Sequence, residues 1–289
     1  MRHPEMEAKT MLPLHSNTNY SRVPGRTPFI LLLLGAVILS LIFPLYLSLF
    51  GGVSASHAPK PIPAKPSGTL RVMTYNIRHG EGLDNRVDLE RTIGELQKAN
   101  PDVVALQEVD RYWWRSGMED QVKKIAASLH MYYEYSPSIQ KGFAQYGNAL
   151  LSRYPLTAPH IYALPGEKEP RSVITVQLDT AHGPVTIAAT HLGVSAEDRK
   201  RQLPLVTDIV AALPGPKIVM GDFNAGAAGP GMAALLSAVA PIPLIDPMGT
   251  VQHGGEIDHI LTNLPLSGDA WTQASDASDH IPVISDLRL

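Results

Sequence analysis

Short apolar runs of β-strand character, each followed or interrupted by an acidic, amide or imidazole side chain, recur through residues 68–289 of this sequence. In KIVMGDFN, three apolar residues (218–220) lead into Gly221, Asp222 and Asn224. Other runs carry polar residues in the same way: Asn76, Glu108, His191, Asp258 with His259, and Asp279 with His280. Because strand ends meet at the rim of a sheet, we expect these side chains to converge on one pocket.

Helical patterns separate the apolar runs. Leu89, Ile93 and Leu96 recur at helical spacing, with Asp88 as the N-cap and Pro101 just beyond the end. A second helix is expected in EDQVKKIAASLH. A third opens at a capping box formed by Ser195 and Asp198, and Pro204 predicts that it is broken or kinked.

Strands are expected in TLRVMTYNI, DVVALQE, YGNALLS, RSVITVQL, PVTIAATHL, KIVMGD, EIDHILT and PVISDLRL. Two strand-rich halves with interleaved helices predict a sheet packed on a sheet with helices outside. The fold class is therefore a layered α/β or α+β domain.

Residues 29–50 carry no charge and, as a helix, would span about 33 Å at roughly 1.5 Å per residue. We expect a retained transmembrane anchor. The alternative is a cleaved signal peptide with VSA at 53–55 as the processing site, but signal peptides have shorter apolar stretches and this one follows a 28-residue leader. Residues 51–67, rich in Gly, Ser, Ala and Pro, read as an extended linker to a domain at 68–289.

Basic residues near the apolar segment predict its orientation. Arg22 and Arg26 lie close before it, whereas Lys60 and Lys65 lie further beyond it. The positive-inside rule then puts the leader (1–28) in the cytoplasm and the folded domain outside, as a single-pass membrane protein.

The composition narrows the chemistry. Hydrophobic residues make up 44% of the 289 positions, as in a globular protein, and there is no cysteine, which excludes thiolate nucleophiles and sulfur-ligated metals. The chain has 24 basic and 27 acidic residues, of which residues 1–65 hold six and two, so the remainder carries a net charge of −7. That balance argues against tight, non-specific binding to nucleic acid.

The types of the strand-end residues point to phosphoryl chemistry. Carboxylates with few nitrogen ligands suit magnesium, manganese or calcium, and the histidines are not spaced as a zinc motif. A hard cation beside Asn, His and Arg donors suits attack of an activated water on a phosphate. Any one carboxylate after a strand is more often a turn former or a helix cap. The argument for a catalytic site therefore rests on six strands that each end in such a polar residue, in sequence order.

Seven motifs in order resemble the endonuclease/exonuclease/phosphatase superfamily: VMTYNIR, ALQEVD, YGNALLSRYPL, ATHLG, MGDFNA, IDHIL and SDHIPV. Its members include apurinic endonucleases, pancreatic-type deoxyribonucleases, neutral sphingomyelinases and inositol polyphosphate phosphatases. The resemblance extends from Arg71 to Leu287 and is closest to a bacterial group of metal-dependent hydrolases. It implies a four-layer fold, two mixed β-sheets face to face with helices outside, and a divalent metal, usually magnesium.

The resemblance also implies roles for individual residues. Glu108 would be the principal metal carboxylate, with Asn76 beside it. Asp222 would orient and deprotonate the attacking water, and Asn224 would steady that water and the phosphate. The remaining implied roles are His191 as a donor to the phosphate or leaving group, Asp279 as the residue that holds His280, His280 as a contact of the scissile phosphate or a base, and Asp258 as an acid near His280.

Four further polar residues are candidates for substrate binding: Arg115, Arg171, Asn148 and His79. The two arginines suit bidentate phosphate contacts, although surface salt bridges explain them equally well. Trp113 and Trp114 are more often packing residues than a substrate platform.

The leading interpretation is a membrane-anchored, metal-dependent phosphoesterase that hydrolyses a phosphodiester, with a phospholipid headgroup or a related small phosphoester as the favoured substrate. Two alternatives stay open at this point: an extracytoplasmic nuclease, and a catalytically silent domain that binds a phosphate ligand. No protein partner is inferred.

If residues 29–50 are retained, the protein should stay in the membrane pellet after an alkaline carbonate wash, because an apolar span leaves the bilayer only when the bilayer is dissolved. Immunoblotting of pellet and supernatant measures this. A shortened, soluble form beginning near Ser56 would instead show a cleaved signal peptide.

Overall fold

The computed structural model describes residues 68–245, 249–266 and 268–289. The expected leader (1–28), membrane span (29–50) and linker (51–67) lie outside the described residues. Among the residues that are described, no helix is both long and apolar enough to cross a membrane.

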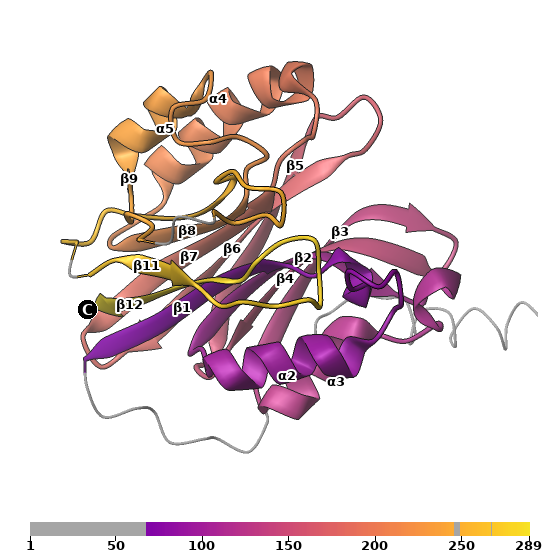
Figure 1. Cartoon of the computed structure of the whole chain (residues 1–289). Helices are drawn as coiled ribbons and strands as arrows, with labels where there is room; N and C mark the ends of the chain where they lie inside the picture. Colours follow the sequence, from indigo (N-terminus) through magenta and orange to yellow (C-terminus); the bar gives the residue numbers. More distant parts are fainter. Residues whose placement is uncertain (1–67, 246–248, 267) are drawn as a thin grey trace, which may run out of the picture. The chain divides into compact units, whose positions relative to one another are not determined.

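Two six-stranded sheets form the centre of the domain (Figure 1). The first sheet has the order β11 (Ala270–Thr272), β12 (Val283–Arg288), β1 (Thr69–Asn76), β2 (Val103–Arg111), β4 (Ala144–Ser152), β3 (Tyr132–Lys141). The second has the order β5 (Leu156–Leu164), β6 (Arg171–Thr180), β7 (Gly183–His191), β8 (Lys217–Asp222), β10 (Asp258–Thr262), β9 (Ala240–Pro241). Both sheets are mixed, because β1–β2 and β7–β8 pair in parallel and the other neighbours are antiparallel.

Helices cover the outer face of each sheet. On the first sheet, α2 (Leu89–Ala99) and α3 (Gln121–Leu129) pack against the buried side chains of β1 and β2. On the second sheet, α4 (Ala196–Ala212) and α5 (Met232–Ala238) pack against β7 and β8. Two short 3-10 turns, η1 (Arg78–Gly80) and η2 (Trp114–Ser116), follow β1 and β2.

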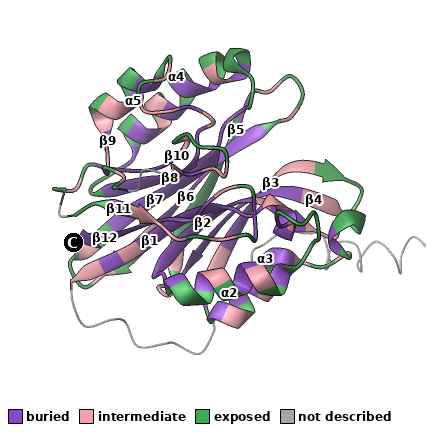
Figure 2. Cartoon of the chain, in the orientation of Figure 1, coloured by how far each residue is buried: buried purple, intermediate pink, exposed green. Residues whose placement is uncertain are grey.

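Three apolar clusters hold the four layers together. One lies between α2, α3 and the first sheet, one between the two sheets, and one between the second sheet, α4 and α5. Figure 2 shows the sheets as mostly buried, while exposed residues gather on the outer faces of the helices and in the loops. The predicted arrangement, two mixed sheets face to face with helices outside, is confirmed.

Local signals explain where the helices begin and end. The Asp88 carboxylate accepts the backbone N–H groups of Glu90 and Arg91 at 3.1 and 3.3 Å, and α2 ends at Asn100 in the left-handed conformation. Ser195 caps α4 by accepting the N–H of Asp198 at 3.1 Å. The sequence predicts a break or a kink at Pro204, and the break is wrong, because α4 continues through Pro204 as one helix.

All eight strands that the sequence predicts are present, and β3, β5, β9 and β11 are additional. Strand β5 escaped prediction because its residues are mostly exposed, so it lacks an apolar run. It lies at the edge of the second sheet, where only one side needs a partner strand.

A glycine brings β7 and β8 together next to the strand ends. Gly221 has φ +152°, and a Cβ atom built on it would lie 2.0 Å from the carbonyl oxygen of Thr190 in β7. Thr190 pairs with Gly221 and His191 pairs with Asp222 in the parallel register. The expected close backbone approach at Gly221 is therefore present, and it fixes the position of the next residue, Asp222.

We expect Gly221→Ala to destabilise the protein by at least about 2 kcal/mol, because the new Cβ has to displace β7 or β8. Gly94→Ala is the matched control. Gly94 lies within α2, and a Cβ there would meet nothing within 4 Å, so alanine should stabilise by about 0.5–1 kcal/mol. Chemical denaturation of the full chain measures both, and equal stabilities of the two variants would contradict the close approach.

Candidate active site

Adjacent strands deliver three polar side chains to one point on the second sheet. Asp222 ends β8, His191 ends β7 and pairs with it in register, and Asp258 opens β10 and also pairs with it. Side chains of neighbouring residues point to opposite faces of a strand. His259 accordingly points to the other face, where its Nε2 donates to the Ala225 carbonyl at 2.8 Å.

Asn76, at the end of β1, joins the two sheets at this point. Its Nδ2 donates to Oε1 of Glu108 at 3.0 Å and to Oδ2 of Asp222 at 3.1 Å. Its Oδ1 accepts the backbone N–H of Arg78 at 3.1 Å. Both ends of the amide are engaged, so Asn76 positions the two carboxylates in this structure.

Glu108 lies at an irregularity in β2. The register between β2 and β4 shifts between Leu106 and Val109, and Glu108 has φ +60°. A bulge of this kind re-aims one side chain without ending the strand. Glu108 is thereby turned toward Asn76, whereas its neighbour Gln107 stays paired with β1.

Two histidines lie beside Asp222, and one of them also contacts Asp258. His280 Nδ1 lies 2.9 Å from Oδ2 of Asp258, and His280 Nε2 lies 3.7 Å from Oδ2 of Asp222. His191 Nε2 lies 3.4 Å from the same oxygen of Asp222. These distances place Asp222 between two histidines.

In the structure, Asp258 and not Asp279 makes the hydrogen bond to His280. The Asp279 side chain is 50% exposed, and its Oδ2 lies 3.9 Å from Nε of Arg78. Asp258, which is buried, makes the contact with His280 instead. Asp279 remains at the rim, next to Ser278, whose hydroxyl donates to the Asn76 carbonyl at 2.8 Å.

Burial and neighbouring charges shift the pKa values of these groups. Burial, with the charge of Asp258, raises the pKa of Asp222 to about 7 against the opposing effect of His280. Burial opposes the charge on His280, but the carboxylates of Asp258 and Asp222 prevail and raise its pKa to about 9. Burial and the charges of Arg171 and His280 lower the pKa of His191 well below its ordinary value. His191 is therefore neutral and His280 cationic at neutral pH.

Asn224 stabilises the turn after β8. It has φ +51°, a conformation that asparagine tolerates better than most residues. Its backbone N–H donates to Oδ1 of Asp222 at 2.8 Å, and its side-chain Nδ2 donates to the Leu192 carbonyl at 2.9 Å. Asn224 thus holds Asp222 and ties the loop after β8 to the loop after β7.

The two candidate arginines have different surroundings. Arg115 makes a bidentate ion pair with the buried Asp110, with both contacts at 2.8 Å, and its side chain is 44% exposed. Arg171 is 4% exposed and pairs with Glu169, while its Nε is buried without a hydrogen-bond partner. The charge of Arg171 acts on His191, so Arg171 lies at the site. Arg115 is a salt-bridge residue at its edge.

The two other candidates for substrate binding are buried. Asn148 in β4 donates from Nδ2 to the Ser172 carbonyl at 3.4 Å, which places it between the sheets. His79 in η1 lies 3.2 Å from Glu81, measured from Nε2 to Oε2.

The sequence does not single out three residues of the site: Tyr146, Glu169 and Ser278. Tyr146 interacts with Glu169 and Arg171. Ser278 holds the backbone at Asn76. All three lie within or beside the motifs YGNALLS, EPRS and SDH, but none carries a sequence signal of its own, because only the fold brings them together.

The donor set fits a hard divalent cation. Asp222, Asp258 and His280 offer ligand atoms within 4.8 Å of one another, and the orphaned Oδ1 of Asp258 is buried without a partner. However, Nδ1 of His280 is already hydrogen-bonded to Asp258, and the positive charge of the imidazolium offsets the negative charges of Asp222 and Asp258. Glu108, held by Asn76 and without a neighbouring imidazolium in contact, is the better anchor for an ion that prefers oxygen.

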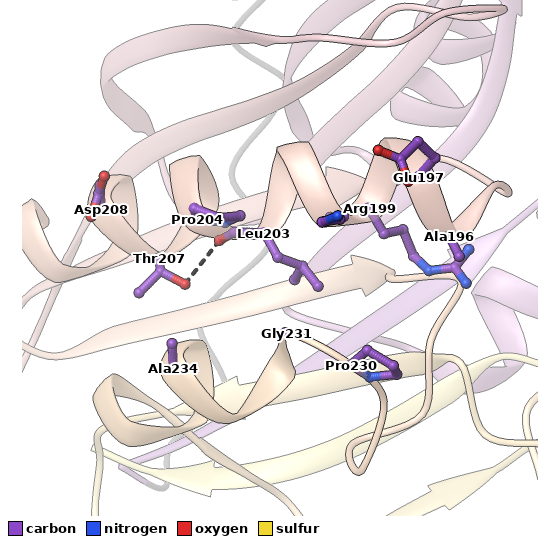
Figure 3. A pocket seen from close by; sticks show the side chains of 11 residues that line it. Ala196, Glu197, Arg199, Leu203, Pro204, Thr207, Asp208, Pro230, Gly231 and Ala234 are labelled. Carbon is purple, nitrogen blue, oxygen red and sulfur yellow. Dashed lines mark hydrogen bonds between the residues drawn. The ribbon is translucent and has the colours of Figure 1, made fainter.

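A cavity of about 630 Å³ lies between α4 and α5, apart from these groups (Figure 3). Leu203, Pro204, Pro230 and Ala234 provide its apolar lining, with Arg199 at one end. No candidate catalytic residue lines it. The chemistry therefore belongs to the rim of the sheets and not to this cavity.

Two mixed sheets face to face, with carboxylates and histidines gathered at their rim, are features of a family of phosphoester hydrolases. The chain belongs to the Endonuclease/Exonuclease/phosphatase family, whose model matches residues 73–280. No curated protein matches the chain.

Solved structures support this assignment. An endonuclease/exonuclease/phosphatase from Beutenbergia cavernae is 26% identical, with a TM-score of 0.65, and the match covers 76% of this chain and 72% of that one. Truncated TDP2 from Caenorhabditis elegans is 21% identical, with a TM-score of 0.56 and coverage of 76% and 98%. A mannosyl-6-phosphatase from Bacteroides thetaiotaomicron is 17% identical, with a TM-score of 0.55 and coverage of 75% and 99%. The last two similarities show the fold alone.

Asp258→Asn should lower the pKa of His280 from about 9 toward its ordinary value, because it removes the largest carboxylate effect that opposes burial while Asp222 and Asp279 remain. Imidazole NMR titration of the chelator-treated protein measures it. In the wild type, this pair contributes stability that is complete below pH 6.5 and is lost as the pH rises through about 9. The control is Asp279→Asn, which should lower the pKa less; a larger effect there would reverse our assignment of the two aspartates.

Proposed function

We propose that this chain is a membrane-anchored, divalent-metal-dependent phosphoesterase that hydrolyses a phosphodiester by water attack. One observation carries the proposal. A buried carboxylate, Asp222, has a pKa raised to about 7 and is held by Asn76 and Asn224 beside a second carboxylate, Glu108. A base with a pKa near the operating pH suits proton abstraction from water.

Asp222 and the residues around it each have a separate role in the proposed hydrolysis. Asp222 accepts the proton of the attacking water, and Asn76 and Asn224 keep its two oxygens oriented. His280, cationic because Asp258 raises its pKa, donates to a phosphoryl oxygen and stabilises the charge that develops there. His191 is neutral and donates a hydrogen bond toward the phosphate or the leaving group.

Glu108 is the residue we propose as the metal ligand, and magnesium is the favoured ion, with manganese or calcium as alternatives. A divalent cation supplies Lewis-acid polarisation of the phosphoryl oxygen. The bulge at Glu108 and the hydrogen bond from Asn76 support this role, because they fix the carboxylate next to the proposed base.

The favoured substrate is a phospholipid headgroup or a related small phosphodiester. We propose that residues 29–50 anchor the protein, that the leader is cytoplasmic and that the domain is extracytoplasmic, for which the apolar run and the flanking arginines are the support. The linker of 17 residues would then keep the site within a few tens of ångströms of the bilayer and raise the effective concentration of lipid substrates.

An extracytoplasmic nuclease is less favoured. The net charge of −7 after residue 65 repels a polyanion, and the repulsion weakens with added salt. A domain that binds phosphate without catalysis is also less favoured, because Asp222, Asn76 and Glu108 form a connected set. The mannosyl-6-phosphatase among the structural neighbours has the same fold, which makes a small phosphoester substrate compatible with it.

The full chain in detergent should hydrolyse a short-chain phospholipid or bis-p-nitrophenyl phosphate with magnesium, and degrade plasmid DNA poorly at about 0.15 M salt, where surface charges are only partly screened. Glu108→Gln keeps the size of the side chain but removes its charge. It should lower turnover by roughly 10²-fold or more and raise the magnesium concentration needed for half-maximal activity.

Magnesium titration of both proteins, with each substrate, gives the answer. Superimposable titration curves would rule out Glu108 as the main ligand. Efficient plasmid degradation with no hydrolysis of the lipid or the small diester would favour the nuclease.

A further inference from the structure

Two neighbouring turns of the first sheet expose large aromatic side chains. Trp114 in η2 is 86% exposed, and Phe143, in the turn between β3 and β4, is 51% exposed. Tryptophan is highly buried on average in globular proteins, so an indole that lies in water calls for an explanation. A Cβ atom built on Gly117, which follows η2, or on Gly142 in the other turn would meet nothing within 4 Å among the described residues. Both turns are therefore open at these positions.

Contacts on either side of the turns show that they are neighbours. Arg111, at the end of β2, pairs with Gln145 at the start of β4, and its Nη1 donates to Oε1 of Gln145 at 3.1 Å. Nζ of Lys141, at the end of β3, lies 5.8 Å from the ring centroid of Trp113, the residue before Trp114. We call four residues of these turns the aromatic patch: Trp113, Trp114, Lys141 and Phe143.

The aromatic patch lies at the same end of the sandwich as the candidate active site. β1 and β2 are parallel neighbours (Figure 1), so Trp113 and Trp114, which follow β2, lie at the end where Asn76 closes β1. β4 runs antiparallel to β2, so the turn that precedes β4 lies at that end too. Cζ of Arg115 lies 5.2 Å from the ring centroid of Trp113 and 5.4 Å from that of Tyr146, which connects the patch to the site.

The composition of the aromatic patch fits the interfacial region of a phospholipid bilayer. Tryptophan concentrates in that region because its ring is apolar and its N–H group is polar. A lysine beside it extends its apolar stem along the ring and places its ammonium group among the lipid phosphates. Interfaces between proteins also use exposed tryptophan, so the choice of partner needs a further observation.

The chain that precedes the domain supplies that observation. Residues 29–50 are the proposed membrane anchor, and residues 51–67 lead to the start of β1, which is the end away from the site. The eight residues of β1 span about 26 Å at roughly 3.3 Å per residue. Seventeen residues of polyproline II would span about 53 Å at roughly 3.1 Å per residue. A linker of this length allows the site end of the domain to face the bilayer, where a surface that binds lipid would hold it.

We propose that the aromatic patch docks on the phospholipid bilayer, with Trp114 and Phe143 at the boundary between headgroups and acyl chains and Lys141 against the phosphates. Docking turns the candidate active site toward the lipid, so that a headgroup reaches the site without its lipid leaving the bilayer. The inference rests on the proposed function, in particular on its membrane anchor, and adds the surface that orients the domain. The acid–base chemistry remains with Asp222.

The three tryptophans of the chain supply a probe and its control, because residues 1–67 contain none. Trp113→Phe with Trp271→Phe leaves Trp114, whereas Trp113→Phe with Trp114→Phe leaves Trp271. Trp271 is in β11, at the opposite edge of the first sheet from β3, and Cζ of Arg71 lies 5.5 Å from its ring centroid.

Each full-length variant is reconstituted into vesicles of phosphatidylcholine and phosphatidylglycerol, with or without a phosphatidylcholine that is brominated on its acyl chains. Bromine quenches indole fluorescence only at short range, so the loss of emission measures contact with the acyl region. Circular dichroism checks that each variant is folded.

The brominated lipid should remove most of the emission of Trp114 and little of that of Trp271, because a tether alone keeps an indole out of the acyl region. In the variant that retains Trp114, Phe143→Asp should abolish the quenching, since a charge resists insertion. Leu205→Asp is the matched control. It adds the same charge at an exposed apolar position on α4, away from the patch, and should leave the quenching unchanged.

Equal quenching of Trp114 and Trp271, or quenching of Trp114 that Phe143→Asp leaves unchanged, would overturn the inference. A Trp114 emission that is insensitive to the lipid and shifts with protein concentration would overturn it too, and would assign the patch to contact between copies of this chain. Hydrolysis of bis-p-nitrophenyl phosphate by the same preparations reports separately on the proposed function. Quenching without hydrolysis would count against the phosphoesterase and support the docking surface, whereas hydrolysis without quenching would do the reverse.

Discussion

The side-chain amide of Asn76 is the contact on which the geometry of the site depends. Its nitrogen donates to Glu108 in the first sheet and to Asp222 in the second, so one residue holds together two acids that burial and like charge would drive apart. The position of Asn76 follows in turn from β1, which pairs with β2 on one side and β12 on the other, and from Ser278, which holds its carbonyl. The sandwich therefore serves to bring strand ends from both sheets within hydrogen-bonding distance of one amide.

Regular strands alone would not aim these side chains correctly. Glu108, Asn224 and His79 all have positive φ, and each lies at or just beyond a strand carrying a site residue. Each such residue costs on the order of 1–3 kcal/mol and persists only where the surroundings over-determine it. The apolar clusters on both faces of each sheet provide that constraint, because they fix β1, β2 and β8 up to their last residues. Strain thus concentrates where direction of a side chain matters more than local stability.

The sequence predicts much of this architecture because burial leaves a periodic signal, and much less of the site because hydrogen bonding does not. The eight apolar runs became strands, and Asp88 and Ser195 cap helices as expected. Exposed β5 left no apolar signal, and Pro204 did not end α4, which continues to Ala212. In the sequence, Asp279 is the neighbour of His280 and Asp258 lies 22 residues away. Only the fold, in which β10 pairs with β8 and brings Asp258 opposite Asp222, allows Asp258 to contact His280.

The charges at the rim bear on how the site can hold a phosphate. Glu108, Asp222 and Asp258 are three acids, whereas His280 and Arg171 supply two positive charges and Arg171 is also paired with Glu169, so the ionised site is negative and would repel a phosphate. A divalent cation at Glu108 would offset this negative charge and so favour the binding of an anionic phosphoester. The acidity of the domain as a whole is compatible with an anionic substrate. Attraction depends on the few groups that share the low-dielectric site with the phosphate, because salt screens the exposed acids elsewhere within about 10 Å.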